Sequence, residues 1–309
     1  MKITQYLLRL YPRTWRERYE EEFLAMLEQR PISFLDGIDL FFGALDAQLH
    51  PHLGTTGMSL YERIVHLFAT LRRSLLTIFC AYVGFILAGW AFQKMTEYDD
   101  FKEAAQTHSI VGLSFHLVVI GAVAALLAVL AGGLPIAVAV VRSALVQKRR
   151  GPLLLLATPI LAFAIFLGTM FLLEAFHHPG NQHSPMGQMV LDRGLFFGTL
   201  IAAAIVSAGS VCFAVARSEI SERLLHFAVL PSILATISMA LILAATITWG
   251  LSLRDGAPQL FAGNNGIVGS STIGTWLAIV IAMAIATVLA ALSLMRGLSA
   301  RSALRNVTV

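Results

Sequence analysis

The sequence predicts an all-α polytopic membrane protein with six transmembrane helices and a small N-terminal cytoplasmic helical hairpin. Hydrophobic residues make up 57% of the 309 residues and charged residues only 13%, whereas soluble domains carry about 25% charged residues. The apolar residues fall in long blocks, and a helix needs about 20 such residues to cross a bilayer. The predicted spans are residues 75–92, 110–141, 152–173, 195–216, 227–253 and 272–295.

The basic residues predict the orientation of these spans, because lysine and arginine resist translocation across the membrane. Of the 22 lysines and arginines, only Lys94, Lys102, Arg193 and Arg254 fall in the loops on one side. We therefore expect both termini to be cytoplasmic. The expected domains are a helical prefix over 1–73, a transmembrane domain over 74–296 and a cytoplasmic tail over 297–309.

The first prefix helix is expected over about 12–29, where Pro12 suits a first helical position. Aromatic and apolar residues recur at spacings of four and three and so share one face. These predicted core residues of the hairpin are Trp15, Tyr19, Phe23 and Met26. The other faces carry opposite charges one helical turn apart, which stabilise the helix weakly and give it a charged surface. We treat this surface as the candidate docking surface for a partner. Its residues are Arg13, Arg16, Glu17, Arg18, Glu20, Glu21 and Glu22.

The second prefix helix is expected over about 33–49, beginning at Ser33 as the N-cap. Ile38, Phe42 and Leu45 repeat the helical spacing and give the first helix an apolar partner. The turn between the two helices is short, which favours an antiparallel hairpin. A third helix is expected over about 59–73, and it leads toward the first span.

The spans contain a weak internal repeat that is compatible with three helical hairpins. Arg-Ser pairs follow the second, fourth and sixth spans, at Arg142, Arg217 and Arg301. A duplicated hairpin would produce such a pattern. Chance would also produce it, because alanine, valine and leucine are common in all spans, and both explanations stay open.

The interiors of the spans contain almost no charged residue, which weakens a proton-pumping reading. His116 is the ionisable group at depth, and we expect a neutral ring bonded to a neighbouring carbonyl rather than a proton relay. The span serines that could pair with it lack a G-x-S-x-G setting; they are Ser207, Ser210 and Ser238. We expect no enzyme, no catalytic residue and no cofactor.

Two further groups of soft ligands occur in the chain. Cys80 and Cys212 both lie in predicted spans, so we expect two satisfied, buried thiols rather than a disulfide. The loop HHPGNQHSPMGQM offers ligands to copper or zinc: His177, His178, His183, Met186 and Met189. Their irregular spacing, without a carboxylate or cysteine, favours a solvated loop over a metal site.

Residues 7–51 resemble the permease-prefix domain and the helix-turn-helix-associated α-helical signalling (HAAS) domain of bacterial membrane proteins. The resemblance rests on a D-x-x-x-G-A-L-D-A helix that ends at Ala47, and on an aromatic and charged run before it. The residues of that run are Tyr11, Pro12, Arg13, Trp15, Glu17, Arg18, Tyr19, Glu20 and Glu21. The resemblance implies a bacterial cytoplasmic membrane and a cytosolic partner such as a PadR-like transcription regulator or a sigma factor.

Two functions remain open at this stage. In the first, the chain is a membrane-anchored regulator whose prefix docks a cytosolic partner and does not itself bind nucleic acid. In the second, it is the membrane subunit of a permease or transporter, with any ATPase on a separate chain. A discontinuous helix near the middle of the membrane would favour transport. A prefix that only packs against the inner loops would favour neither function.

Overall fold

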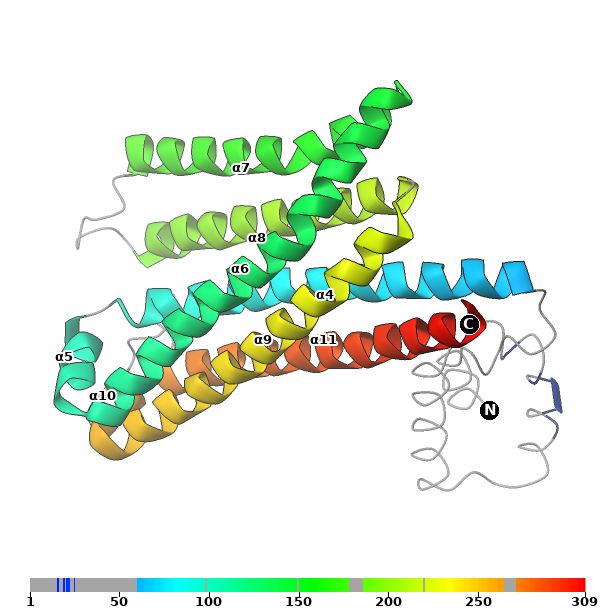
Figure 1. Cartoon of the computed structure of the whole chain (residues 1–309). Helices are drawn as coiled ribbons and strands as arrows, with labels where there is room; N and C mark the ends of the chain where they lie inside the picture. The colour runs from blue at the N-terminus through cyan, green and yellow to red at the C-terminus, as the bar shows by residue number, and fades with distance from the viewer. Residues whose placement is uncertain are drawn as a thin grey trace. The chain divides into compact units, whose positions relative to one another are not determined.

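The computed structural model describes most of the chain beyond residue 59 (Figure 1). The described residues are 60–97, 99–148, 150–177, 186–218, 220–263 and 271–308, with Arg16, Tyr19, Glu21, Glu22 and Ala25. The elements in this part are all α-helices, which confirms the predicted all-α class. They are α4 (Leu60–Met95), α5 (Asp99–Thr107), α6 (Ser109–Val146), α7 (Arg150–His177), α8 (Met186–Arg217), α9 (Glu222–Gly256), α10 (Pro258–Ala262) and α11 (Thr272–Thr308).

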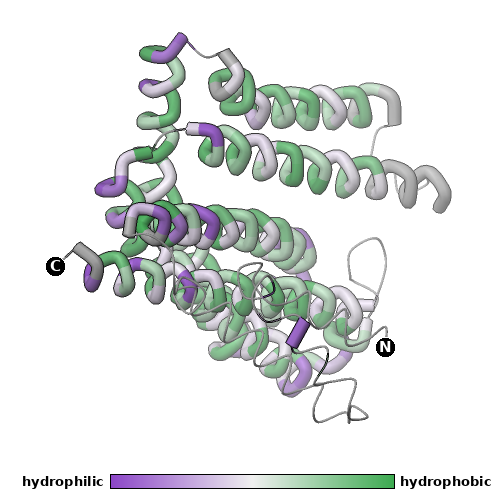
Figure 2. The backbone as a smooth tube through the Cα atoms, turned by 90° about the vertical axis from the view of Figure 1, so that its right-hand side faces the viewer, coloured by the Kyte–Doolittle hydropathy of each residue, from purple (hydrophilic) through white to green (hydrophobic). Residues whose placement is uncertain are grey.

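Six of the described helices are long and apolar enough to cross a membrane, as the sequence predicts. They are α4, α6, α7, α8, α9 and α11, and Figure 2 shows hydrophobic residues along their length. Each helix is longer than the apolar stretch within it. Polar residues can continue a helix beyond the hydrocarbon layer because water satisfies them there.

The helix α4 joins the segment expected as the third prefix helix to the first span without a break. No proline stands between Leu60 and Met95, and Glu62 lies in the first turn, where a carboxylate favours the helix dipole. At the other end of the chain, α11 continues through residues 297–308. The residues expected as a tail are therefore helical.

The chain divides into two compact units. One unit contains residues 1–77 and 291–309, so it includes the prefix, the start of α4 and the end of α11. The other unit contains residues 78–290. The sequence placed the first boundary at 73 and did not join the two ends of the chain.

Within the unit 78–290, α6 packs mainly against α9 and α7 against α8. Glycines allow the first of these contacts, because they let two backbones approach closely. A Cβ at Gly121 would stand 2.6 Å from Ile242 Cγ1, and one at Gly132 would stand 2.9 Å from Pro231 Cβ. Half of the residues in the most apolar window of α9 are buried, against 6% in α7. The helix α9 is thus central to this unit and α7 is peripheral.

Three spans contain an internal proline, and all three helices continue through it: Pro135 in α6, Pro159 in α7 and Pro231 in α9. The sequence allowed α6 either to tilt or to bend at Pro135. The described spans are therefore continuous helices and do not contain the broken helix pair that would favour a transport function.

Two short helices that the sequence analysis did not predict lie between the spans. The helix α5 begins with Asp99 and Asp100, whose charges favour a helix N-terminus. Its Phe101 ring packs 5.8 Å from the ring of Trp249. The helix α10 places Phe261 at 5.6 Å from Trp276. Aromatic packing against the ends of the spans explains why these short segments are helical.

Candidate functional site

The described prefix residues are helical and differ in exposure. Glu21 and Glu22 are exposed, which suits a docking surface, whereas Arg16 is half-buried and its Nε has no hydrogen-bond partner. Tyr19 is 37% exposed, so the structure does not enclose this predicted core position. A tyrosine ring can lie partly exposed because its hydroxyl group is polar. The other predicted hairpin and docking residues lie outside the described residues: Arg13, Trp15, Glu17, Arg18, Glu20, Phe23, Met26, Ile38, Phe42 and Leu45.

The start of α4 and the end of α11 pack together through a small apolar cluster. Leu67 and Ala300 are fully buried in it, and Leu304 is 2% exposed. Alanine at the contact lets the two helices come close, and the leucines fill the remaining space. Ile64 and Phe68 cover the edge of the cluster. We call this contact the α4–α11 end.

Beside this apolar cluster, α4 and α11 cross at a hydrogen bond. The hydroxyl of Ser74 donates a hydrogen bond to the carbonyl of Ser293. A Cβ at Gly297 would stand 2.8 Å from Ser74 Oγ and 3.6 Å from Leu71 Cδ1, so glycine is needed at this approach. The backbone of α11 therefore lies directly against the side chains of α4 at the α4–α11 end.

Three basic residues belong to the same unit as this crossing: His66, Arg73 and Arg296. Arg73 precedes Ser74 in the chain and is exposed, and Arg296 precedes Gly297 and is half-buried. The two arginines lie within electrostatic range of each other, and both lie within range of the His66 ring. His66 Nδ1 and Arg296 Nε are buried and have no hydrogen-bond partner among the residues that the structure describes. A buried polar atom without a partner costs about 1–3 kcal/mol in folding free energy. We call these three residues the basic cluster.

Cys80 of α4 and Cys212 of α8 lie side by side, with their sulfur atoms 3.4 Å apart and no disulfide between them. The expectation of buried thiols was wrong, because Cys80 is exposed and Cys212 is half-buried. The prediction failed because residues of a span that face lipid are as apolar as residues that face another helix.

His116 makes the bond that the sequence predicts. Its Nδ1 lies 2.7 Å from the carbonyl oxygen of Gly112, one turn earlier in α6. The span hydroxyls behave similarly: Ser210 donates to the carbonyl of Ser207 at 2.9 Å, and Thr246 to that of Ile242 at 2.9 Å. Groups that are satisfied within their own helix do not form a chain of polar side chains across the membrane.

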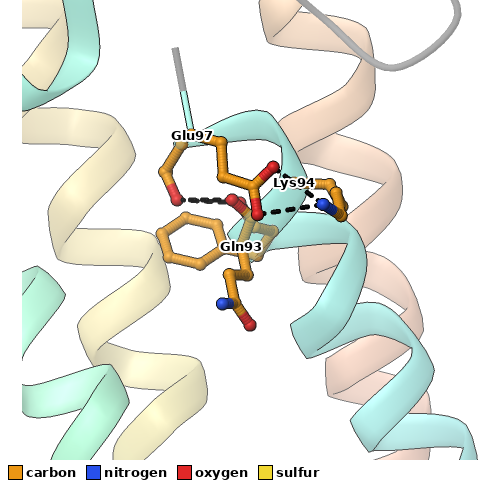
Figure 3. A network of polar contacts seen from close by, with 5 residues as sticks. Gln93, Lys94 and Glu97 are labelled. Carbon is orange, nitrogen blue, oxygen red and sulfur yellow. Dashed lines mark hydrogen bonds and ion pairs between the residues drawn. The ribbon is translucent and has the colours of Figure 1, made fainter. Parts of the chain in front are cut away.

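Two exposed ion pairs lie near the junction of α4 and α5. Lys94 Nζ lies 2.8 Å from a carboxylate oxygen of Glu97 (Figure 3), and Lys102 Nζ lies 2.7 Å from Asp99. The hydrogen bond from Lys102 and its positive charge lower the pKa of the Asp99 carboxyl. Exposed pairs of this kind stabilise proteins only weakly.

The histidine- and methionine-rich loop, for which the sequence favours a solvated loop over a metal site, falls between α7 and α8. The helix α7 ends at His177 and α8 begins at Met186, while His178 and His183 lie outside the described residues. Among the residues that the structure describes, no group of three or more histidines, cysteines or carboxylates could hold a metal ion.

The basic cluster was not predicted, because Arg73 and Arg296 were used only to predict the orientation of the spans. A usable signal was present. Arg73 stands just before the predicted first span, and Arg296 stands just after the predicted sixth span. Both residues were thus predicted to lie at the same membrane boundary.

Comparison with protein-family models, with curated proteins and with solved structures finds no match to this chain. A proposal about its function must therefore come from the residues and their geometry.

Proposed function

We propose that this chain is a membrane-anchored regulator whose N-terminal prefix docks a cytosolic partner. The proposed partner is a transcription regulator or a sigma factor, and the proposed location is the cytoplasmic membrane of a bacterium. The proposed orientation has both termini in the cytoplasm. The asymmetric distribution of lysine and arginine supports that orientation.

The observation that carries the proposal is the continuity of α4 from Leu60 to Met95. A continuous helix that begins within the prefix and extends into the first span can transmit a shift or rotation along its length. Ligand or lipid binding to the spans would act on the prefix by favouring one position of this helix.

The α4–α11 end adds a second connection of the same kind. Residues 291–309 belong to the same compact unit as the prefix, and Leu67 packs against Ala300 and Leu304. Two spans, the first and the last, therefore continue into the unit that contains the prefix. A regulator that reports on its own membrane domain needs such a connection.

Capture of partners from native membranes tests the proposal. The intact protein is compared with the double variant Trp15→Ala/Tyr19→Ala, which removes aromatic side chains predicted to hold the hairpin. It is also compared with the triple variant Glu20→Lys/Glu21→Lys/Glu22→Lys, which reverses the charge of a surface on which Glu21 and Glu22 are exposed. Glu222→Lys, an exposed charge reversal at the start of α9, is the control.

The regulator proposal predicts that a transcription regulator or sigma factor crosslinks to the intact protein and to the Glu222→Lys control. Both prefix variants should lose that partner. Capture of an ATPase subunit, or of no specific protein, would contradict the proposal. The alternative, a permease subunit, would then be tested by measuring substrate flux in proteoliposomes.

A further inference from the structure

We propose that the basic cluster at the α4–α11 end, His66, Arg73 and Arg296, binds the phosphate of an anionic lipid headgroup. This inference is independent of the proposed regulator function, because it concerns the membrane rather than a cytosolic partner.

The geometry brings the cluster together from both ends of the chain. His66 and Arg73 are seven residues apart in α4, and two turns of helix place them on the same face. Arg296 is adjacent to Gly297, whose backbone lies against Ser74 and Leu71 of α4. The hydrogen bond from Ser74 to Ser293 fixes this approach. Three basic side chains are therefore held around one crossing point.

The cluster combines an exposed arginine, Arg73, with an arginine whose Nε is buried, Arg296. In the described part of the chain, Arg73 and Arg296 form no ion pair, although each carries a permanent positive charge. The buried Nε of Arg296 is always a donor and has no acceptor. A bound water or a bound ion can satisfy such a donor. An anion would satisfy the donor and reduce the repulsion between the arginines.

The predicted level of the cluster in the membrane indicates which anion lies near it. Arg73 and Arg296 flank the predicted first and sixth spans at one membrane boundary, and the phosphates of the lipids occupy that level. Guanidinium groups bind phosphate oxygens through two parallel hydrogen bonds. Basic pockets between transmembrane helices recognise anionic lipid headgroups in this way.

The test reconstitutes the full chain in two types of nanodisc, one of phosphatidylcholine alone and one of equal parts phosphatidylcholine and phosphatidylglycerol. Thermal unfolding is followed in both, and bound lipid is measured by native mass spectrometry. A third sample, in neutral detergent, receives inorganic phosphate. The variants are Arg73→Gln/Arg296→Gln, Arg296→Lys, which keeps the charge, and Arg301→Gln, an exposed arginine of α11 outside the cluster.

The proposal predicts that phosphatidylglycerol raises the unfolding temperature of the intact protein and is retained by it. The double variant should bind this lipid about tenfold more weakly, because it loses charge-assisted hydrogen bonds. In pure phosphatidylcholine the double variant should be at least as stable as the intact protein, because it no longer contains two adjacent positive charges. Arg301→Gln should keep the preference for phosphatidylglycerol. Arg296→Lys should keep part of it, because lysine retains the charge but not the paired donors of the guanidinium.

Stabilisation by inorganic phosphate alone, equal to that by phosphatidylglycerol and lost in the double variant, would support a phosphate site and overturn the lipid assignment. An equal response of the intact protein and the double variant to phosphatidylglycerol would overturn the site itself. Equal loss in Arg301→Gln would also overturn it, because the effect would then depend only on net charge. A double variant that fails to fold in phosphatidylcholine would show that the arginines act structurally.

Discussion

The indole N–H of Trp276 donates a hydrogen bond to the backbone carbonyl of Thr246, at 3.0 Å, and both residues are buried. Gly250, one turn after Thr246, faces the same indole ring, and a Cβ at this position would overlap it. The bond and the glycine together hold α11 close to α9 within the unit 78–290.

Replacing Trp276 with phenylalanine removes this hydrogen bond and part of the buried ring. We expect the free energy of unfolding to fall by about 1–2 kcal/mol. Thermal unfolding in detergent, followed by circular dichroism, measures the change. Trp90→Phe is the comparison, because the Trp90 ring is half-buried and packs on Phe196 at 5.0 Å. An equal loss in both variants would show that ring size, rather than the hydrogen bond, accounts for the effect.

Alanine substitution of two adjacent glycines in α6 should change the free energy of unfolding in opposite directions. Gly132→Ala places a methyl group 2.9 Å from Cβ of the rigid Pro231 ring, so we expect a loss of about 1–3 kcal/mol. Gly133→Ala meets nothing within 4 Å, and we expect a gain of up to about 1 kcal/mol from better helix propensity. Thermal unfolding of the two single variants measures both changes. Equal stabilities of the two variants would contradict the packing of α6 on α9.

Cys80 and Cys212 should form a disulfide when an oxidant is supplied, because their sulfur atoms are only 3.4 Å apart. Two membrane-permeable Cu(II)–phenanthroline complexes each accept one electron and become Cu(I), the two thiols release their protons and one S–S bond forms. The oxidised protein should then no longer react with a maleimide reagent, and reduction should restore labelling. The control Cys212→Ser should still be labelled after oxidation. Full labelling of the oxidised intact protein would contradict the pairing of α4 and α8.

The Asp99 carboxyl should titrate below its ordinary range because Lys102 donates a hydrogen bond to the ionised form. A lowered folded-state pKa means that the pair contributes to stability above the unfolded-state pKa. That contribution is lost as the pH falls through the folded-state value. In Lys102→Met the pKa of Asp99 should rise toward its ordinary value, as measured by carboxyl-carbon NMR in nanodiscs. Glu103→Gln is the control, and a change as large as that in Lys102→Met would contradict the assignment.

The number of spans could be predicted from the sequence because the relevant signal is local. About 20 consecutive apolar residues are enough to define each crossing. The bond of His116 to Gly112 was also predictable, since both partners lie on adjacent turns of one helix. The helices α5 and α10 were not predictable in the same way. Short helices are marginal by themselves, and here Phe101 and Phe261 stabilise them by packing on distant tryptophans.

The candidate sites could be predicted less well than the spans, because they depend on tertiary structure. Arg73 and Arg296 could be assigned to one membrane boundary from the sequence, but their approach required the crossing of α4 and α11 at Ser74 and Gly297. The pairing of Cys80 with Cys212 was not predictable, because nothing local relates two cysteines in different spans.

The sequence by itself determined that this protein consists of membrane-spanning helices, because a backbone in lipid must satisfy its own hydrogen bonds within each segment. Only the tertiary structure decided which face of each helix contacts another helix. Lipid is as apolar as the interior of the protein, so hydrophobicity does not distinguish a contact such as Gly132 from an open position such as Gly133. That distinction depends on close packing and on single hydrogen bonds between helices, which form only when the helices meet.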